Sequence, residues 1–66
     1  MNTDDIGIVI RKRRDAKGIT QRALSEMSGV HLRTINNLEA GKGNPSIDVI
    51  QKIAYVLNLE IIVRVA

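Results

Sequence analysis

The chain has 66 residues, a formal net charge of +3, no cysteine and one histidine, so it can form one domain with a thin core but no disulfide, thiolate metal site, zinc site or hydrolytic triad. No apolar run approaches the roughly 18 residues of a membrane span, and the start of the chain, with Asp4 and Asp5, lacks the basic residues of a signal peptide. We therefore expect a soluble, cytoplasmic protein that needs no cofactor or metal. We also expect that it is not an enzyme, because no two residues have the spacing of a nucleophile with its base.

The first predicted element is a helix that ends at about residue 17, just before a glycine. Ile6 and Ile10 stand four residues apart and supply an inward-facing apolar pair. Ile8 and Val9 lie off that stripe, so we expect them to remain partly outside the core of a monomer. They are candidates for a second contact surface.

The next two predicted elements form a helix, a tight turn and a second helix over residues 20–42. Thr20 can cap the first of these helices, at about residues 21–28, and Gly29 can end it in the left-handed conformation. The chain can then reverse and begin the second helix, which we expect over residues 31–41. The apolar side chains that the first of these helices should bury are Ala23, Leu24 and Met27.

The outer face of the second helix is the most informative feature of the sequence. At about 100° per residue, Arg33, Asn36 and Asn37 lie opposite the apolar Ile35 and Leu38. Arginine matches the acceptors of guanine, and asparagine matches the donor and acceptor of adenine. The alternative is an ordinary solvated helix face, although asparagine is a poor helix former. The tight turn before this helix and its basic surroundings favour base reading.

The basic residues are concentrated in the middle of the chain. Residues 11–42 contain eight basic and three acidic residues, a balance of +5, whereas the two ends together carry −2. Such a concentrated positive charge is typical of a surface that binds nucleic acid. A solvated charged face is the plainer interpretation, so the charge supports the prediction without deciding it.

A fourth helix is predicted after the loop GKGNP, with Ser46 as its cap. Apolar residues then recur at helical spacing, and Tyr55 is expected to be a packing or rim residue. The residues expected to complete the core are Ile47, Ile50, Ala54 and Leu57, with Val49, Ile53 and Val56 widening the stripe.

The last segment, residues 59–66, alternates apolar and polar positions in a way that favours a β-strand. The sequence offers no second strand, so we expect this strand to pair with another copy of the chain in a two-stranded ribbon. A frayed tail is the alternative. The predicted dimerisation residues are Leu59, Ile61, Ile62, Val63 and Val65.

These elements predict a mainly α fold in a single domain spanning residues 1–66, with residues 59–66 as a dimerisation strand. The stretch IGIVIRKRRDAKGITQRALSEMSGVHLRTINNLEAGKGNPSIDVIQKIAYVLNLEI resembles the Xre, or lambda-repressor-like, helix-turn-helix family. The resemblance is in register at Arg14, Gly18, Thr20, Gln21, Leu24, Gly29, Val30, Ile35, Glu39 and Gly41. Within that family, RTINNLEAGKGNPS followed by LEIIV is most similar to HipB-type antitoxin repressors.

The resemblance implies a role for several residues. Leu32 joins Arg33, Asn36 and Asn37 at the positions that face the bases. Arg14 and Glu39 match a structural pair that joins the first helix to the reading helix. The residues placed at the DNA phosphates are Gln21, Arg22, His31, Lys42 and Asn44.

Two residues depart from the family pattern. Arg13 replaces a commonly apolar residue, so either its aliphatic stem lies over the core or the first helix packs differently. His31 replaces a serine or threonine. Its neutral ring could accept a backbone hydrogen bond, or its protonated ring could approach a phosphate.

We therefore expect a sequence-specific transcriptional repressor that binds double-stranded DNA, at a palindromic operator, as a homodimer. The antitoxin resemblance implies a HipA-like toxin kinase as a partner. One alternative is a phage or mobile-element repressor without a toxin. Another is a protein-interaction module that keeps this fold and uses its surface to hold a partner.

Overall fold

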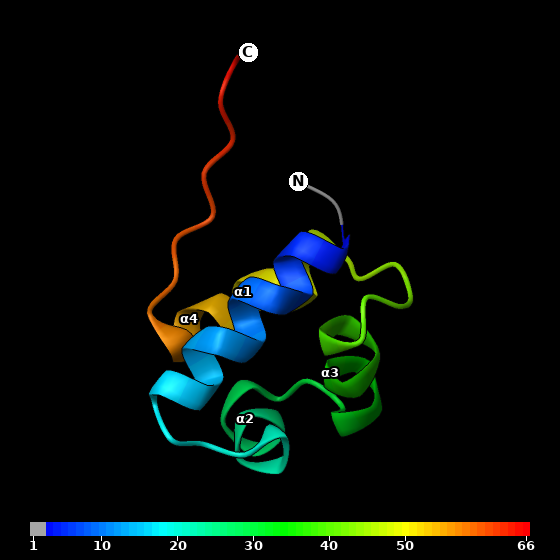
Figure 1. The fold of residues 1–66 in the computed structure, drawn as a ribbon, viewed down its shortest axis with the longest axis vertical. Helices are drawn as coiled ribbons and strands as arrows, with labels where there is room; N and C mark the ends of the chain where they lie inside the picture. The colour runs from blue at the N-terminus through cyan, green and yellow to red at the C-terminus, as the bar shows by residue number, and fades with distance from the viewer. Residues whose placement is uncertain (1–2) are drawn as a thin grey trace.

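The chain folds into four helices in a computed structural model that describes residues 3–66 (Figure 1). The helices are α1 (Thr3–Ala16), α2 (Gln21–Ser28), α3 (Leu32–Glu39) and α4 (Ile47–Leu57). The mainly α prediction is confirmed, and the bounds of α2 are those expected. Helix α3 is shorter than predicted at both ends, because His31 and Ala40 flank it as caps.

The core is made by apolar side chains from all four helices and from the turn between α2 and α3. Leu24 of α2, Ile35 of α3 and Ile53 of α4 are completely buried. The remaining members of the buried cluster are Ile10, Val30, Leu38 and Leu57. Ile8 and Val9 are 50% and 41% exposed, as the first-helix pattern predicts.

The prediction that Ile47 and Met27 belong to the core is wrong. Ile47 is 57% exposed, whereas Ile53, expected at the edge of the stripe, is fully buried. Ile47 precedes Ile53 by six residues, which places it about 120° away around the helix. Met27 is 60% exposed and borders a surface hollow that also contacts Tyr55 of α4.

Local hydrogen bonds fix both ends of α2 and the turn that joins α2 to α3. Thr20 caps α2, since its Oγ1 accepts from the Ala23 N–H at 3.0 Å. Gly29 ends the helix with φ 77°, a left-handed conformation that suits glycine. The Ser25 hydroxyl donates to the Val30 carbonyl at 2.6 Å, and the Val30 side chain is buried. The two helices therefore leave this turn in a fixed relation.

The end of α4 explains the unusual Arg13. Its Nε donates to the Leu57 carbonyl at 2.8 Å, so a positive charge lies at the negative end of the α4 dipole. Arg13 is half-buried, in agreement with the first of its two expected arrangements. Asn58 then takes the left-handed conformation with φ 56°, and the Leu59 N–H donates to the Ala54 carbonyl at 2.9 Å.

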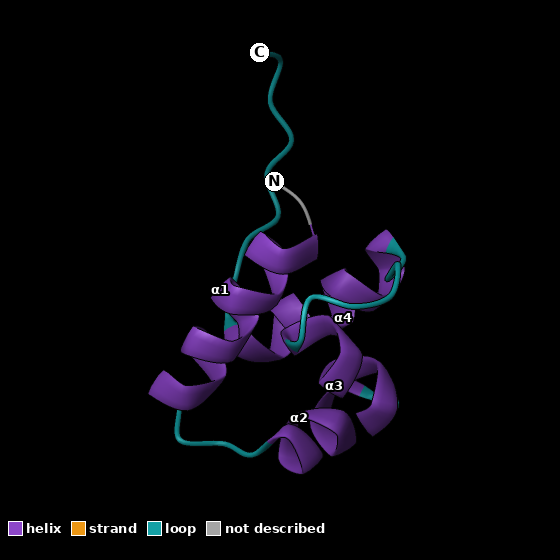
Figure 2. Ribbon diagram, turned by 45° about the vertical axis from the view of Figure 1, so that its right-hand side comes forward, coloured by secondary structure: helices purple, strands orange, loops and turns teal. Residues whose placement is uncertain are grey.

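The terminal segment does not form the predicted strand in the single chain. No strand is present among residues 3–66, and the segment after α4 is a loop whose end extends away from the helices (Figures 1 and 2). The physical reason is that a strand needs a partner for its backbone groups, and the described part of the chain supplies none. Within the same residues, every helix is too short or too polar to cross a bilayer.

Candidate nucleic-acid interface

Helix α3 has one buried face and one exposed polar face, as its sequence predicts. Ile35 is 0% exposed and Leu38 is 1% exposed, so they hold the helix on the core. Arg33, Asn36 and Asn37 are all exposed on the other side. Leu32, at the start of the helix, is half-buried, so it offers only part of its side chain to this face.

The loop after α3 is fixed to the last turn of that helix. The Gly41 N–H donates to the Leu38 carbonyl at 3.1 Å, and the Lys42 N–H donates to the Asn37 carbonyl at 2.7 Å. This pair of bonds is a Schellman motif, which requires the left-handed conformation that Gly41 adopts with φ 73°. The backbone of Lys42 is therefore held in a defined position beside α3.

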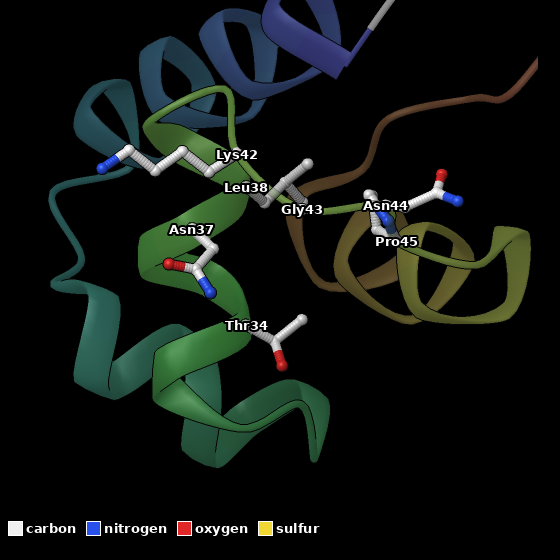
Figure 3. A pocket seen from close by; sticks show the side chains of 7 residues that line it. All are labelled: Thr34, Asn37, Leu38, Lys42, Gly43, Asn44 and Pro45. Carbon is white, nitrogen blue, oxygen red and sulfur yellow. The ribbon is translucent and has the colours of Figure 1, made fainter.

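A surface hollow of about 230 Å³ lies between α3 and this loop (Figure 3). Thr34, Asn37 and Leu38 of α3 form one side, and the loop residues form the other: Lys42, Gly43, Asn44 and Pro45. Lys42 and Asn44 are exposed. Two of the residues predicted to bind phosphate thus lie next to a residue predicted to read bases.

The pair Arg14 and Glu39 joins α1 to the end of α3. Arg14 Nε and Nη2 donate to the two carboxylate oxygens of Glu39, each at 2.8 Å, and Nη1 donates to the Ile19 carbonyl at 2.9 Å. The side chains are only 11% and 3% exposed. The pair implied by the family resemblance is therefore present as a bidentate ion pair whose side chains are largely shielded from solvent.

Burial and hydrogen bonding act in opposite directions on Glu39. Burial raises the pKa of its carboxyl, but the hydrogen bonds from Arg14 and Gln21, together with the positive charges of Arg14 and Arg11, outweigh burial and leave the pKa below the ordinary value of 4.5. The hydrogen bond to Glu39 raises the pKa of Arg14, against a smaller effect of burial. Both groups are therefore held in their charged forms.

Gln21 makes contacts that its position in the sequence does not predict. We expected it at a DNA phosphate, and it does open α2, but its Nε2 donates to Glu39 Oε1 at 3.1 Å. Its Oε1 accepts a hydrogen bond from Asn36 Nδ2. The only signal in the sequence was an amide at the start of a helix next to the reading helix. Arg22, the following residue, is exposed.

His31 is exposed at the start of α3. Within the described residues its side chain makes no capping hydrogen bond, so the ring is not a backbone acceptor here. The ring is accessible to a ligand, and its contact with a DNA phosphate remains a prediction.

The predicted dimerisation residues lie in a separate region from this interface. Leu59 packs against the core of its own chain, and its N–H is bonded to Ala54. Ile61 and Ile62 line an apolar hollow of about 330 Å³. The other walls of this hollow come from α1, from α4 and from the residues just after α4: Ile6, Val9, Ile10, Ile47, Ile50, Ala54, Leu59 and Glu60. Val63 and Val65 are 91% and 100% exposed.

The sequence of this chain is similar to that of known proteins. Residues 10–63 match the family described as helix-turn-helix, a span that includes all of α2, α3 and α4. An uncharacterized HTH-type transcriptional regulator of Archaeoglobus fulgidus is 46% identical over 52 residues, which cover 79% of this chain and 74% of that protein.

Proposed function

The chain belongs to the helix-turn-helix family of DNA-binding regulators, and from this premise we propose that it represses transcription by binding a palindromic operator as a homodimer. The observation that carries this proposal is the exposed face of α3. Arg33, Asn36 and Asn37 stand together there, opposite a buried face that fixes the helix to the core. The protein acts by binding, without a catalytic step.

Base reading follows from the donors and acceptors on this face. Arg33 can donate two hydrogen bonds to guanine O6 and N7, and the asparagines can pair with adenine N6 and N7. The major groove is wide enough to admit a helix, and α3 follows the tight turn at Gly29. Helix α3 is therefore the recognition helix of this proposal.

Phosphate contacts would hold that helix in register on the duplex. Lys42 and Asn44 lie exposed in the loop after α3, and Arg22 lies exposed in the first turn of α2. His31 adds an exposed ring at the start of α3. These side chains flank the reading face, where the sugar-phosphate backbone borders the groove.

A symmetric dimer would make the protein selective, because one recognition helix covers few base pairs. Two such helices need to lie about 34 Å apart, one helical turn along the DNA. We assign the junction to residues 60–66, which carry the apolar, exposed Ile62, Val63 and Val65. Antiparallel pairing about a two-fold axis would satisfy their backbone groups and cover the hollow bordered by Ile61.

The biological setting we propose is an antitoxin that regulates its own promoter and binds a HipA-like kinase. This part of the proposal is supported by the likeness of RTINNLEAGKGNPS and LEIIV to HipB-type repressors. A repressor of a phage or mobile element would have no such kinase. Co-purification with the product of a neighbouring gene tests the antitoxin setting. The setting is contradicted if no neighbouring gene encodes a kinase that binds this protein.

Selection of bound duplexes from a random pool, at a stated salt concentration, tests the main proposal. We expect recovery of a short inverted repeat with half-sites one helical turn apart. Equal binding to all duplexes would contradict sequence-specific repression. The absence of salt-dependent binding to any duplex would instead favour a protein-interaction module that keeps this fold.

A further inference from the structure

Four side chains form one line of hydrogen bonds from the inside of the protein to the reading face. Arg14 donates to Glu39, Gln21 donates to Glu39, and Asn36 donates to Gln21. Its inner end is the pair of Arg14 and Glu39, whose side chains are 11% and 3% exposed, and its outer end is Asn36, an exposed residue of α3. It crosses three helices, α1, α2 and α3.

The direction of every hydrogen bond in this line is fixed by the ion pair. Arg14 can only donate, and the charged carboxylate of Glu39 can only accept. Gln21 must therefore turn its Nε2 toward Glu39, which it meets at 3.1 Å. Its Oε1 then faces the other way, as an acceptor.

Asn36 is oriented by that acceptor. An exposed asparagine can usually exchange the positions of its oxygen and nitrogen, because water satisfies both arrangements. Here the Nδ2 of Asn36 must face Gln21 Oε1 in order to donate to it. Among the described residues no donor binds Asn36 Oδ1, so this oxygen and the second N–H remain available to a ligand.

We propose that Gln21 is a positioning residue that makes Asn36 select adenine. The inference rests on the proposed function, since it requires α3 to lie in the major groove. Adenine offers an N6 donor for Oδ1 and an N7 acceptor for the remaining N–H. Guanine and thymine present acceptors at the corresponding edge, which would face the Asn36 oxygen. Cytosine offers a donor but lacks the N7 acceptor.

Contact between Gln21 and a phosphate would have a different signature. A phosphate contact carries no sequence information, so its loss weakens binding to every duplex alike. Loss of a positioning residue changes the ratio between duplexes, because Asn36 regains the freedom to turn its amide toward guanine or thymine. The ratio of two affinities therefore separates the two roles.

The experiment uses the full chain and four labelled duplexes that differ at a single base pair of the selected site. That base pair is the one whose preference disappears in Asn36→Ala. Affinities are measured for the unmodified protein, for Gln21→Met and for Gln51→Met. The last variant makes the same chemical change at an exposed glutamine of α4. If Gln21→Met does not fold, Gln21→Ala is measured in its place.

We expect the unmodified protein and Gln51→Met to prefer adenine, and Gln21→Met to lose at least about fivefold of the preference for adenine over guanine. In the Asn36→Ala background, Gln21→Met should change no preference, because its effect passes through Asn36. A uniform loss on all four duplexes, or a shift that persists without Asn36, overturns the inference and leaves base reading by α3 intact. Unchanged preference in Asn36→Ala at every position overturns the assignment of Asn36 itself.

Discussion

A β-carbon on Gly7 would stand 2.1 Å from the carbonyl oxygen of Leu38, so α1 and α3 meet here in direct backbone contact. Real β-carbons do not approach other atoms so closely, and the neighbour is backbone rather than a side chain that could turn away. Gly7 is therefore the residue that allows α1 to lie against the last turn of the recognition helix.

The first prediction is that Gly7→Ala destabilises the protein. Alanine at an ordinary helix position is more favourable than glycine by roughly 0.5 to 1 kcal/mol. At Gly7 the overpacking should reverse that sign and cost about 1 to 3 kcal/mol, measured by urea unfolding. Arg11→Ala, at an exposed position of the same helix, should have little effect. Equal or greater stability for Gly7→Ala would contradict the close contact.

The second prediction concerns pH. Because the pKa of Glu39 is lowered in the folded protein, its contribution to stability is present above its ordinary value of 4.5 and is lost as the pH falls through the folded-state pKa. Unfolding free energies measured from neutral pH to about pH 3 should therefore decrease. Glu39→Gln should be less stable at neutral pH, and the two curves should converge in acid. Parallel curves would show that Glu39 has no lowered pKa.

The third prediction tests the arginine of the reading face. Arg33→Ala should weaken binding to the preferred site by roughly 1 to 3 kcal/mol and relax the preference at one base pair. Thermal stability should hardly change, because the side chain is exposed. Arg11→Ala removes the same charge from α1 and should leave the base preference intact. Unaltered affinity and preference in Arg33→Ala would remove it from the interface.

The fourth prediction separates phosphate binding from base reading. Lys42→Ala should weaken binding to specific and random duplexes alike, and should flatten the slope of log affinity against log salt by about 0.9 for one lost phosphate contact. Lys52→Ala is the control, since this exposed lysine of α4 pairs with Asp48 on its own helix. An unchanged slope for Lys42→Ala would show that it makes no phosphate contact.

The fifth prediction is that residues 60–66 make the dimer. Deleting them should shift the protein toward monomer, lower its thermal stability and weaken DNA binding. Ile62→Pro should act in the same direction because it removes one backbone donor, whereas Ile62→Val keeps that donor and should remain dimeric. Sedimentation at micromolar concentration measures this. A truncated chain that dimerises as tightly as the full chain would place the junction elsewhere, for example on α4.

Much of the helical framework could be predicted because its signals are local. Thr20 and Gly29 mark the two ends of α2, and the spacing of Ile35 and Leu38 defines the buried side of α3. Those features also indicated which side chains of α3 would be exposed. The Arg14 and Glu39 pair was expected from the family resemblance alone, because nothing local connects residues in different helices.

The rest depends on how the helices meet, which no local pattern contains. Gly7 lies among apolar residues, a hint of close approach, but the sequence does not say which helix approaches it. The broad apolar stripe of α4 could have faced the core through Ile47 or through Ile53. The link from Gln21 to Asn36 likewise arises from the distance between two helices. The terminal segment has strand-like alternation, but whether it forms a strand depends on a partner strand, which its own pattern does not supply.

The contacts of Gly7 and Arg14 with the end of α3 also limit how α1 can change in length. Gly7 and Arg14 are seven residues apart, two helical turns less about 20°, so both face α3 at Leu38 and Glu39. Inserting or deleting one residue between them would rotate one contact by about 100° relative to the other. Either the ion pair or the backbone contact would then be lost. Relatives that retain both contacts should therefore preserve this seven-residue interval, while length changes elsewhere in the chain accumulate in the loops.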